Sequence, residues 1–425
     1  MKLLRIIFHI DNLIATLLAI VVIQHFTIYQ NLDFLNPFIN LAQDLDVTDV
    51  VFSKIRNDGR YGVDSNIVLV NIGTLNRRGI AEEINIINQY SPKIIAIDAM
   101  FRKPKTNNLD IPLHNAFLNT KNLVLSSKLN FDYNKDKFTS IINPCSTIIT
   151  KNSDIGFVNV ITENSFKGLN IEQQKEMQKK YARTIRKVTT RETVNDKTYY
   201  SFPAEILKLY APDKFEKLKN RKSNIEIIDY SRHADKFITL DVNDIFESSP
   251  KLNLIRNRIV LMGFMGENIN TLQNEDIFFS PLNTKFIGKT FPDMYGVVLH
   301  ANVLSMMLRE SYFTQVSDKI NEIIKYFIVF IMMTGLLFLR YRFDMLYEPI
   351  SIILVFSSLI LWFVLIIYLF NAYYIYLDLT DLFFYILIII PIFELYQDSL
   401  KPMILKITKR TFENFKLLNT RNRKK

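Results

Sequence analysis

The chain has 425 residues, 49% of them hydrophobic and 22% charged, and carries a formal net charge of +10. This hydrophobic share argues against a protein that is soluble throughout, so we expect part of the chain to lie in lipid. The single cysteine, Cys145, excludes an intrachain disulfide framework, so a domain outside the cytoplasm would have to be stable through its core alone.

An apolar run near the N-terminus predicts a first membrane helix within residues 1–30. The run from Leu13 to Tyr29, with its flanks, is long enough to cross a bilayer core of roughly 30 Å. It ends in bulky residues such as Phe26 and offers no small-x-small cleavage site. We therefore interpret it as an uncleaved anchor and not as a signal peptide.

Residues 31–318 predict one extracytoplasmic α/β domain with a mixed or mostly parallel sheet and packed helices. Apolar, β-branched runs at 66–72 and 93–98 are typical of buried strands, and 79–90 between them has apolar residues at helical spacing. This strand-helix-strand order implies parallel strands with helices packed on the sheet. A helix at 113–119 and a strand at 123–125 repeat the alternation.

Later segments of this domain continue the pattern. Ser201 is placed to cap a helix whose first turn contains Pro203. A strand at 258–263 precedes a helix at 295–308, which leads towards the second membrane segment. The polar stretch at 162–180 reads as an insertion or a surface helix.

Three further apolar runs, within residues 319–397, each have the length of one spanning helix: 323–339, 350–370 and 382–396. Four crossings place both termini on one side of the membrane. Lys and Arg flank the runs on that side, whereas the connection 371–381 has neither. The positive-inside rule therefore predicts that both termini are cytoplasmic and that residues 31–318 are not.

Four ionisable residues, Asp11, His25, Asp378 and Asp381, lie near the ends of the predicted spans. An ion or proton pathway would place such groups at mid-membrane depth. We therefore interpret them as interfacial residues that face headgroups or water, and we disfavour a transporter.

The basic segment 398–425 has apolar residues at near-helical spacing. It predicts either an amphipathic helix that contacts anionic lipid or a partner, or a frayed charged end. The candidate contact residues are Lys406, Lys409, Arg410, Phe412 and Phe415. Because the segment adjoins a membrane helix, we expect no nucleic-acid partner.

A series of short stretches, in order along the chain, carries a family resemblance. The strongest is Pro-Asp-Met-Tyr-Gly-Val-Val-Leu-His-Ala-Asn at 292–302. The others are 48–56, 67–72, 94–101, 183–187, 201–204, 259–263, Asp276, and Ser280 with Pro281. Together they resemble the CHASE2 domain, an extracytoplasmic sensory module of bacterial membrane receptors.

The resemblance implies one membrane helix, the sensory module and three more helices in a bacterial inner membrane.

Two positions depart from the family pattern: Gly73 stands where an acidic residue is usual, and Ser280 stands where a threonine is usual. Similar proteins carry a cyclase, kinase or related domain after the last helix. Here about 30 residues follow it, so we expect no cytoplasmic output domain.

Five residues are candidates for ligand binding or for structure: Asp98, Asp276, Ser280, His300 and Asn302. Asp98 ends a strand, where ligands of open α/β sheets gather, although such an aspartate often only caps a turn. For His300, a core or capping role is the ordinary case. Ser280 precedes a proline outside any nucleophile elbow, so a hydrolase triad with Asp276 and His300 ranks behind structure. We therefore expect no enzyme activity.

The composition also bears on metals and cofactors. Five histidines and one cysteine without clustered spacing make a structural zinc site improbable. The sequence has no Walker loop and no Gly-x-Gly-x-x-Gly. We expect neither a metal nor a cofactor.

Two functions remain. In the first, the domain binds a small ligand or an envelope protein, and the helices couple this to a separate partner. Tyr295, Gly296 and Arg309 are then the coupling candidates, because they lie on the helix that leads to the membrane. In the second, the chain is a structural docking subunit of a larger envelope or membrane complex. Self-association of the chain is compatible with both functions.

Overall fold

The computed structural model describes residues 7, 9–28, 47–56, 62–132, 135, 137–159, 184–269, 276–283 and 292–407. The predicted insertion at 162–180 and the predicted contact residues Lys409, Arg410, Phe412 and Phe415 lie outside these ranges. The chain divides into an α/β unit, Val47–Phe313, and a helical unit that combines Met1–Asp46 with Thr314–Lys425.

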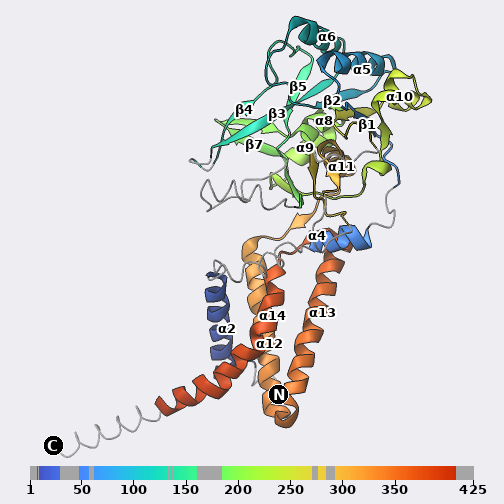
Figure 1. Ribbon diagram of the computed structural model, residues 1–425. Helices are drawn as coiled ribbons and strands as arrows, with labels where there is room; N and C mark the ends of the chain where they lie inside the picture. The colour runs from blue at the N-terminus through green and yellow to red at the C-terminus, as the bar shows by residue number, and fades with distance from the viewer. Residues whose placement is uncertain are drawn as a thin grey trace, which may run out of the picture. The chain divides into compact units, whose positions relative to one another are not determined.

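A seven-stranded sheet forms the centre of the α/β unit (Figure 1). Its order is β10-β1-β11-β2-β3-β4, and β5 also pairs with β3. Only the pairing of β3 with β4 is antiparallel among these. The strands are β1 (Ile67–Asn71), β2 (Ile94–Asp98), β3 (Leu123–Asp132), β4 (Lys137–Ile142), β5 (Ser153–Phe157), β10 (Ile238–Leu240) and β11 (Ile259–Gly263).

Helices cover both faces of the sheet. On one face lie α5 (Arg77–Gln89), α6 (Asn107–Leu118) and α10 (Val242–Phe246). On the other lie α8 (Phe202–Tyr210) and α11 (Gly296–Arg309), which pack against each other. The predicted α/β fold with a mainly parallel sheet is therefore confirmed.

Shorter elements complete the α/β unit. They are α4 (Val47–Val50), η2 (Val51–Ile55), β6 (Lys187–Thr189), β7 (Arg191–Val194), β8 (Lys197–Tyr200), α9 (Pro212–Lys219), β9 (Ile225–Ile227), η4 (Ala234–Lys236), η5 (Pro250–Ile255), β12 (Ile277–Phe278) and β13 (Met294–Tyr295).

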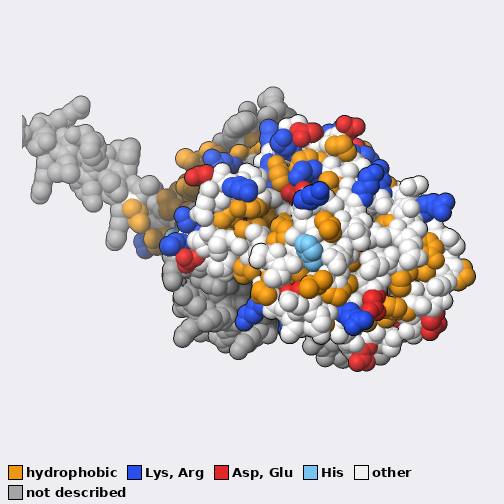
Figure 2. Space-filling view, turned by 90° about the horizontal axis from the view of Figure 1, so that it is seen from above, with side chains coloured by type: hydrophobic (Ala, Val, Ile, Leu, Met, Phe, Trp, Pro, Cys, Tyr) orange, Lys and Arg blue, Asp and Glu red, His pale blue; other side chains and the backbone are white. Residues whose placement is uncertain are grey.

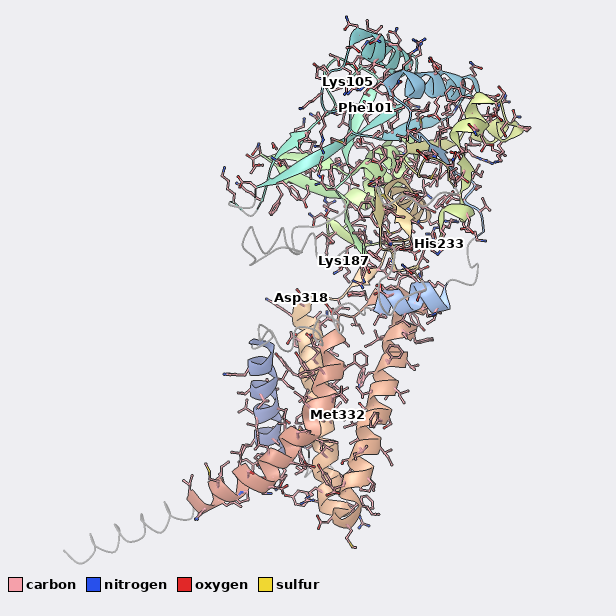
Figure 3. The ribbon with its side chains drawn as sticks, in the orientation of Figure 1. Phe101, Lys105, Lys187, His233, Asp318 and Met332 are labelled. Carbon is pink, nitrogen blue, oxygen red and sulfur yellow. The ribbon has the colours of Figure 1, made fainter. Side chains whose placement is uncertain are left out.

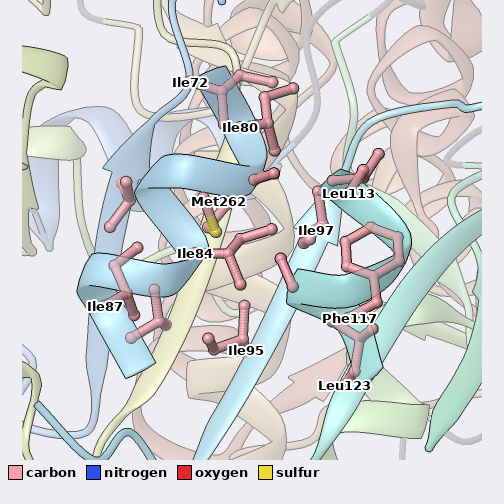
Figure 4. Close-up of a cluster of buried hydrophobic side chains, with 14 of the residues drawn as sticks. Ile72, Ile80, Ile84, Ile87, Ile95, Ile97, Leu113, Phe117, Leu123 and Met262 are labelled. Carbon is pink, nitrogen blue, oxygen red and sulfur yellow. The ribbon is translucent and has the colours of Figure 1, made fainter. Parts of the chain in front are cut away.

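The main core lies between the sheet and the α5–α6 layer (Figure 4). Ile80, Ile84 and Ile87 recur along one face of α5 and meet Ile95 and Ile97 of β2. All five are at most 4% exposed. Burying each side chain contributes roughly 1.5–3 kcal/mol, so the helical spacing read in the sequence corresponds to this face.

Two helix starts differ in how they are capped. The side chain of Asn76 accepts hydrogen bonds from the backbone of Arg78 and Gly79 and so caps α5. Ser201 stands at the N-cap position of α8, as predicted, but its hydroxyl caps nothing. The position was predicted correctly but the side-chain cap was not: the buried hydroxyl of Ser201 has no partner among the described residues, while its backbone bridges to Phe157.

The helical unit contains α2 (Ile10–Ile28), α12 (Asp318–Arg342), α13 (Tyr347–Tyr373) and α14 (Thr380–Glu394), with β14 (Thr314–Gln315), η6 (Asp344–Leu346), β15 (Ile375–Tyr376) and η7 (Leu395–Leu400). The last helical segment runs on to Ile407 and leaves Lys406 exposed. In the part of the chain that the structure describes, three helices are long and apolar enough to cross a membrane: Asp318–Arg342, Asp344–Tyr373 and Asp381–Ile407. By the same criteria Ile10–His25 is a shorter apolar helix.

Asp11 corrects one prediction about the helical unit. Its side chain accepts hydrogen bonds from Tyr341 (3.0 Å), Tyr396 (3.0 Å) and Lys401 (2.6 Å). It is 8% exposed, so it does not face headgroups or water as expected. A carboxylate among apolar helices needs such partners, and here they come from residues at least 330 positions away along the chain.

Candidate functional site

Three strands present a row of residues at the carboxyl edge of the sheet. In register, Asn71 of β1 lies beside Gly263 of β11, and Gly263 lies beside Asp98 of β2. Residues paired across strands share one face of a sheet. Ile97, one position earlier, faces the α5–α6 core, so this row faces the layer of α8 and α11.

The first turns of α11 cover this row closely. A Cβ atom at Gly263 would lie 2.7 Å from Cβ of Val297, so only glycine admits the helix at this distance. A Cβ atom at Gly296 would lie 2.8 Å from Oδ2 of Asp276. Gly296 and His300 are one helical turn apart and share a face of α11.

We call Asp98, Asp276 and His300 the Asp98 cluster. Nε2 of His300 lies 3.8 Å from Oδ2 of Asp98, and the two side chains are 4% and 12% exposed. Burial lowers the pKa of His300 to about 4, so the imidazole is neutral and the contact is not an ion pair. The ring edge packs on Phe202 of α8 at 5.5 Å between centroids.

The pKa values of both carboxyl groups in the cluster are raised, whereas that of His300 is lowered. Burial raises the pKa of Asp98 to about 7. Asp276 is an exposed residue, but loss of hydration around its carboxyl group, and after it the charge of Asp98, raises its pKa to about 7. The positive end of the α11 dipole favours the ionised form by about 0.3–1 kcal/mol, which is less than these shifts. Near neutral pH the cluster can therefore hold or release a proton.

Ser280 is engaged by an aspartate other than Asp276. Ser280 donates a hydrogen bond to Oδ2 of Asp293 (2.5 Å), and its backbone amide bonds to Oδ1 of the same residue (2.8 Å). The structure thus places His300 near Asp98 and pairs Ser280 with Asp293. Within the described residues, no three His, Cys, Asp or Glu side chains are placed to hold a metal ion.

Asn302 joins α11 to the segment after β9. Its Oδ1 accepts from the backbone amides of Ser231 (3.2 Å) and Arg232 (3.1 Å), and its Nδ2 donates to the carbonyl of Arg232 (2.8 Å). The side chain is fully buried. Its hydrogen bonds are used within the fold, so the structure supports the structural reading of this candidate.

Of the three coupling candidates, Tyr295 and Gly296 lie at the start of α11 and Arg309 at its end. The ring of Tyr295 packs edge-on against Phe264 at 6.2 Å. Arg309 donates to Oδ2 of Asp229 at 3.1 Å and to the hydroxyl of Ser231 at 3.2 Å. Both ends of the helix are thus held by specific side chains.

Asp229 also binds Arg56, and we call these two residues and Arg309 the Asp229 network. Nη1 of Arg56 lies 2.6 Å from Oδ1 of Asp229, with side-chain exposures of 2% and 0%. The guanidinium of Arg56 stacks over the rings of Phe52 and Phe313 at 5.4 and 5.7 Å. The first segment of the α/β unit and its last residues therefore meet at one buried carboxylate.

A second buried pair extends this network. Arg232 lies 3.2 Å from Asp64, and the hydroxyl of Ser305 on α11 donates to Asp64 at 2.7 Å. None of Arg56, Asp229, Asp64 and Arg232 was singled out from the sequence. Arg56 and Asp229 are 173 positions apart in the chain, and no local sequence pattern predicts that they pair.

A further buried ion pair lies far from the site, in the α5–α6 layer. Arg77 bonds to Asp110 and to the carbonyl of Lys103, and it stacks over Phe101. Figure 3 places Phe101 and Lys105 beside this layer. This pair joins helices at the side of the sheet opposite the Asp98 cluster, so we assign it to stability.

The surface offers no equally definite feature. On the face shown in Figure 2, basic, acidic and apolar side chains are interspersed. Exposed apolar residues such as Ile111 and Leu118 of α6 occur, but isolated ones are normal on protein surfaces.

Comparison with known proteins gives one match. No curated protein and no solved structure matches the chain. The model of the CHASE2 domain matches residues 16–337, a range that includes the Asp98 cluster and the Asp229 network. This is most of the chain, and the resemblance seen in the sequence is confirmed. The chain belongs to the CHASE2 domain family, a family of extracytoplasmic sensory domains.

Proposed function

We propose that this chain is a membrane-anchored sensory protein without catalytic activity. Its α/β unit recognises a ligand or an envelope protein outside the cytoplasm, and its helices couple that event to a separate partner. The observation that carries the proposal is α11. This helix has the Asp98 cluster at its first turns and the Asp229 network at its last turn.

The packing of α11 supports a role in transmission. Every residue from Gly296 to Leu308 is buried, so the helix cannot shift at one end without moving its neighbours. Only the residues 310–317 separate it from α12. A ligand can act along this path only if it binds one of two arrangements of α11 more tightly than the other.

For the membrane arrangement, we propose four spanning helices: α2 and the three long apolar helices. The basic residues beside Arg340 and in the C-terminal segment favour cytoplasmic termini and an extracytoplasmic α/β unit. A bacterial inner membrane is the compartment that this sensory family implies.

The absence of catalysis is part of the proposal. Ser280, the only nucleophile considered, bonds to Asp293 and lies in no relay with His300. His300 is a weak base, because burial lowers its pKa to about 4, and Asp98 at 3.8 Å is too far away to orient it by a hydrogen bond. We likewise propose that no cofactor or metal takes part.

Affinity purification of the intact chain in mild detergent tests the function. A sensory protein should recover a cytoplasmic signalling partner in less than equal amounts, and substitution of Arg309 by methionine should reduce that recovery without preventing membrane insertion. Recovery of a fixed set of envelope proteins at equal amounts, unaffected by Arg309→Met, would instead show a structural docking subunit. Turnover of esters or phosphoesters by the pure chain would contradict both.

A further inference from the structure

The segment between α11 and α12, residues 310–316, is held from two sides, and we call it the strap. It begins at Glu310, whose φ of 56° ends α11 in a left-handed turn. Its first half belongs to the α/β unit, which ends at Phe313, and its second half belongs to the helical unit. The strap therefore joins the two units within the chain.

Arg221, just after α9, holds the first half of the strap. Its Nη2 donates to the carbonyl of Phe313 at 3.2 Å, and its guanidinium stacks over the ring of Tyr312 at 4.4 Å. Glu226 binds the same guanidinium through both oxygens, at 2.5 and 2.9 Å, and its side chain is fully buried. The ring of Phe313 also carries the guanidinium of Arg56, so this half is anchored to the Asp229 network.

Backbone hydrogen bonds hold the second half of the strap. The amide of Thr314 donates to the carbonyl of Tyr374 at 2.7 Å. The amide of Val316 donates to the carbonyl of Tyr376 at 3.1 Å. Here β14 pairs with β15 in parallel, so the strap runs beside the connection between α13 and α14. The ring of Tyr376 packs on Phe370 of α13 at 6.2 Å, which ties the pairing to that helix.

Side chains of α12 reinforce this pairing. Asn321 donates to the carbonyl of Val316 at 3.2 Å. Lys325, one turn further along α12, lies 2.9 Å from Glu322 and 3.4 Å from Asp381, and its own side chain is 7% exposed. A buried cation is tolerated when it is paired. Because Asp381 lies in the first turn of α14, this contact fixes the start of α12 to the start of α14.

We propose that the strap is a clamp through which the α/β unit acts on α13 and α14 as well as on α12. This inference rests on the sensory function proposed above and names its route into the helical unit. A strap joined only through the chain would pass a shift of α11 to α12 alone. Because the strap also pairs with 375–376, the same shift displaces the connection between α13 and α14.

Disulfide crosslinking of the full chain in its membrane tests the clamp. Thr314 and Ile375 are neighbours in register, and paired strands lie close enough for a disulfide. Thr314→Cys combined with Ile375→Cys should therefore crosslink on mild oxidation, whereas each single variant should not. Thr314→Cys with Tyr368→Cys is the control pair, because Tyr368 is an exposed residue earlier in α13. Native Cys145 is buried and does not compete.

Release of the strap on the α/β side tests transmission. Arg221→Met removes the hold on Phe313, and it should slow crosslinking of the cysteine pair by roughly twofold to tenfold, the shift that corresponds to one lost hydrogen bond. Lys219→Met on α9 removes a pair with exposed Glu216 and should leave the rate unchanged. Arg221→Lys keeps a charge for Glu226 but loses the fork of donors, so it should also slow crosslinking without the risk of misfolding.

Two results would overturn the clamp. One is the absence of a crosslink in the double cysteine variant. The other is a crosslinking rate that is the same in Arg221→Met, Arg221→Lys and Lys219→Met. Neither result decides the sensory function, which the recovery of a partner by Arg309→Met tests separately. Crosslinking that depends on Arg221, together with partner recovery that Arg309→Met does not change, keeps the clamp and contradicts the sensory function.

Discussion

Asp229 shows how much one buried carboxylate can hold together. It is fully enclosed and is shared by Arg56 from the start of the α/β unit and Arg309 from the end of α11. Charges taken out of water are tolerated only when paired and hydrogen-bonded. The network is therefore specific as well as stabilising, because any change at Asp229 removes the carboxylate that two arginines share.

We expect Asp229→Asn to destabilise the chain by about 3–5 kcal/mol, because it removes the negative charge shared by the buried Arg56 and the partly exposed Arg309. Thermal unfolding of the purified chain in detergent measures this. Glu82→Gln is the matched control, since the pair of Glu82 with Arg78 is exposed and is worth about 0.5 kcal/mol. Equal effects of the two substitutions would show that the network contributes nothing beyond a surface pair.

Glu83 provides a pH-dependent prediction. Burial, and after it the charge of Asp241, raises the pKa of Glu83 to about 8, and neither of its oxygens has a hydrogen-bond partner among the described residues. Between pH 4.5 and about 8, the folded chain therefore keeps the proton of Glu83, whereas the unfolded chain releases it. Between the ordinary pKa of 4.5 and about 8, stability falls as pH rises, by about 1.4 kcal/mol per pH unit.

Glu83→Gln removes this dependence because glutamine does not titrate. Relative to the wild type, its melting temperature should rise steadily with pH across that window and level off above about pH 8. Glu82→Gln, one residue earlier and exposed, should show no such trend. Parallel curves for wild type and Glu83→Gln would mean that Glu83 is ionised in the folded chain.

Among the described helices, Asp11 joins α2 to the helical segment that ends at Ile407. Its carboxylate accepts hydrogen bonds from Lys401 and Tyr396 of that segment and from Tyr341 of α12. Asn12 adds a hydrogen bond to Thr334 at 2.8 Å. Between apolar helices there is little hydrophobic drive to associate in lipid, so polar contacts of this kind hold them together.

Asp11→Ala should weaken the association of α2 with α12 and α14 by roughly 1.5–3 kcal/mol, the usual value of hydrogen bonds to a charged group. The measurement is crosslinking between cysteines placed on facing positions of α2 and α12. Asp398→Asn, which affects an exposed ion pair with Arg340 at 3.8 Å, is the control and should leave crosslinking unchanged. Identical crosslinking in all three chains would contradict a role for Asp11.

Elements with a regular local pattern were predictable. The run 66–72 became β1, 93–98 became β2, and the helical spacing between them became α5. Strands β1 and β2 are buried on both faces and therefore read as continuous apolar runs, whereas α5 buries mainly one face and shows helical spacing. Strand β3 was predicted too short, because beyond Leu125 it continues as a hairpin with β4, whose pairing depends on the partner strand.

For the molecule as a whole, the central prediction concerns sidedness. Reporter fusions at Arg342 and at Lys425 should both be cytoplasmic, and protease added outside should cut within the α/β unit, because basic flanks stay on the side of synthesis. A fusion within 371–381 is the opposite control. A C-terminal reporter found outside would mean that α2 does not span, and it would remove the basis for an extracytoplasmic sensor.

The order of hydrophobic runs, the βαβ alternation and the motif Pro292–Asn302 were enough to identify the fold class and the family, because they depend on neighbours in the chain. The pairings of Asp98 with His300, Ser280 with Asp293 and Arg56 with Asp229 were not foreseeable. Which acid meets which base depends on how strands and helices from distant positions pack. The chemistry of the site is therefore decided by the packing of α11 against the edge of the sheet, which is a property of the tertiary structure.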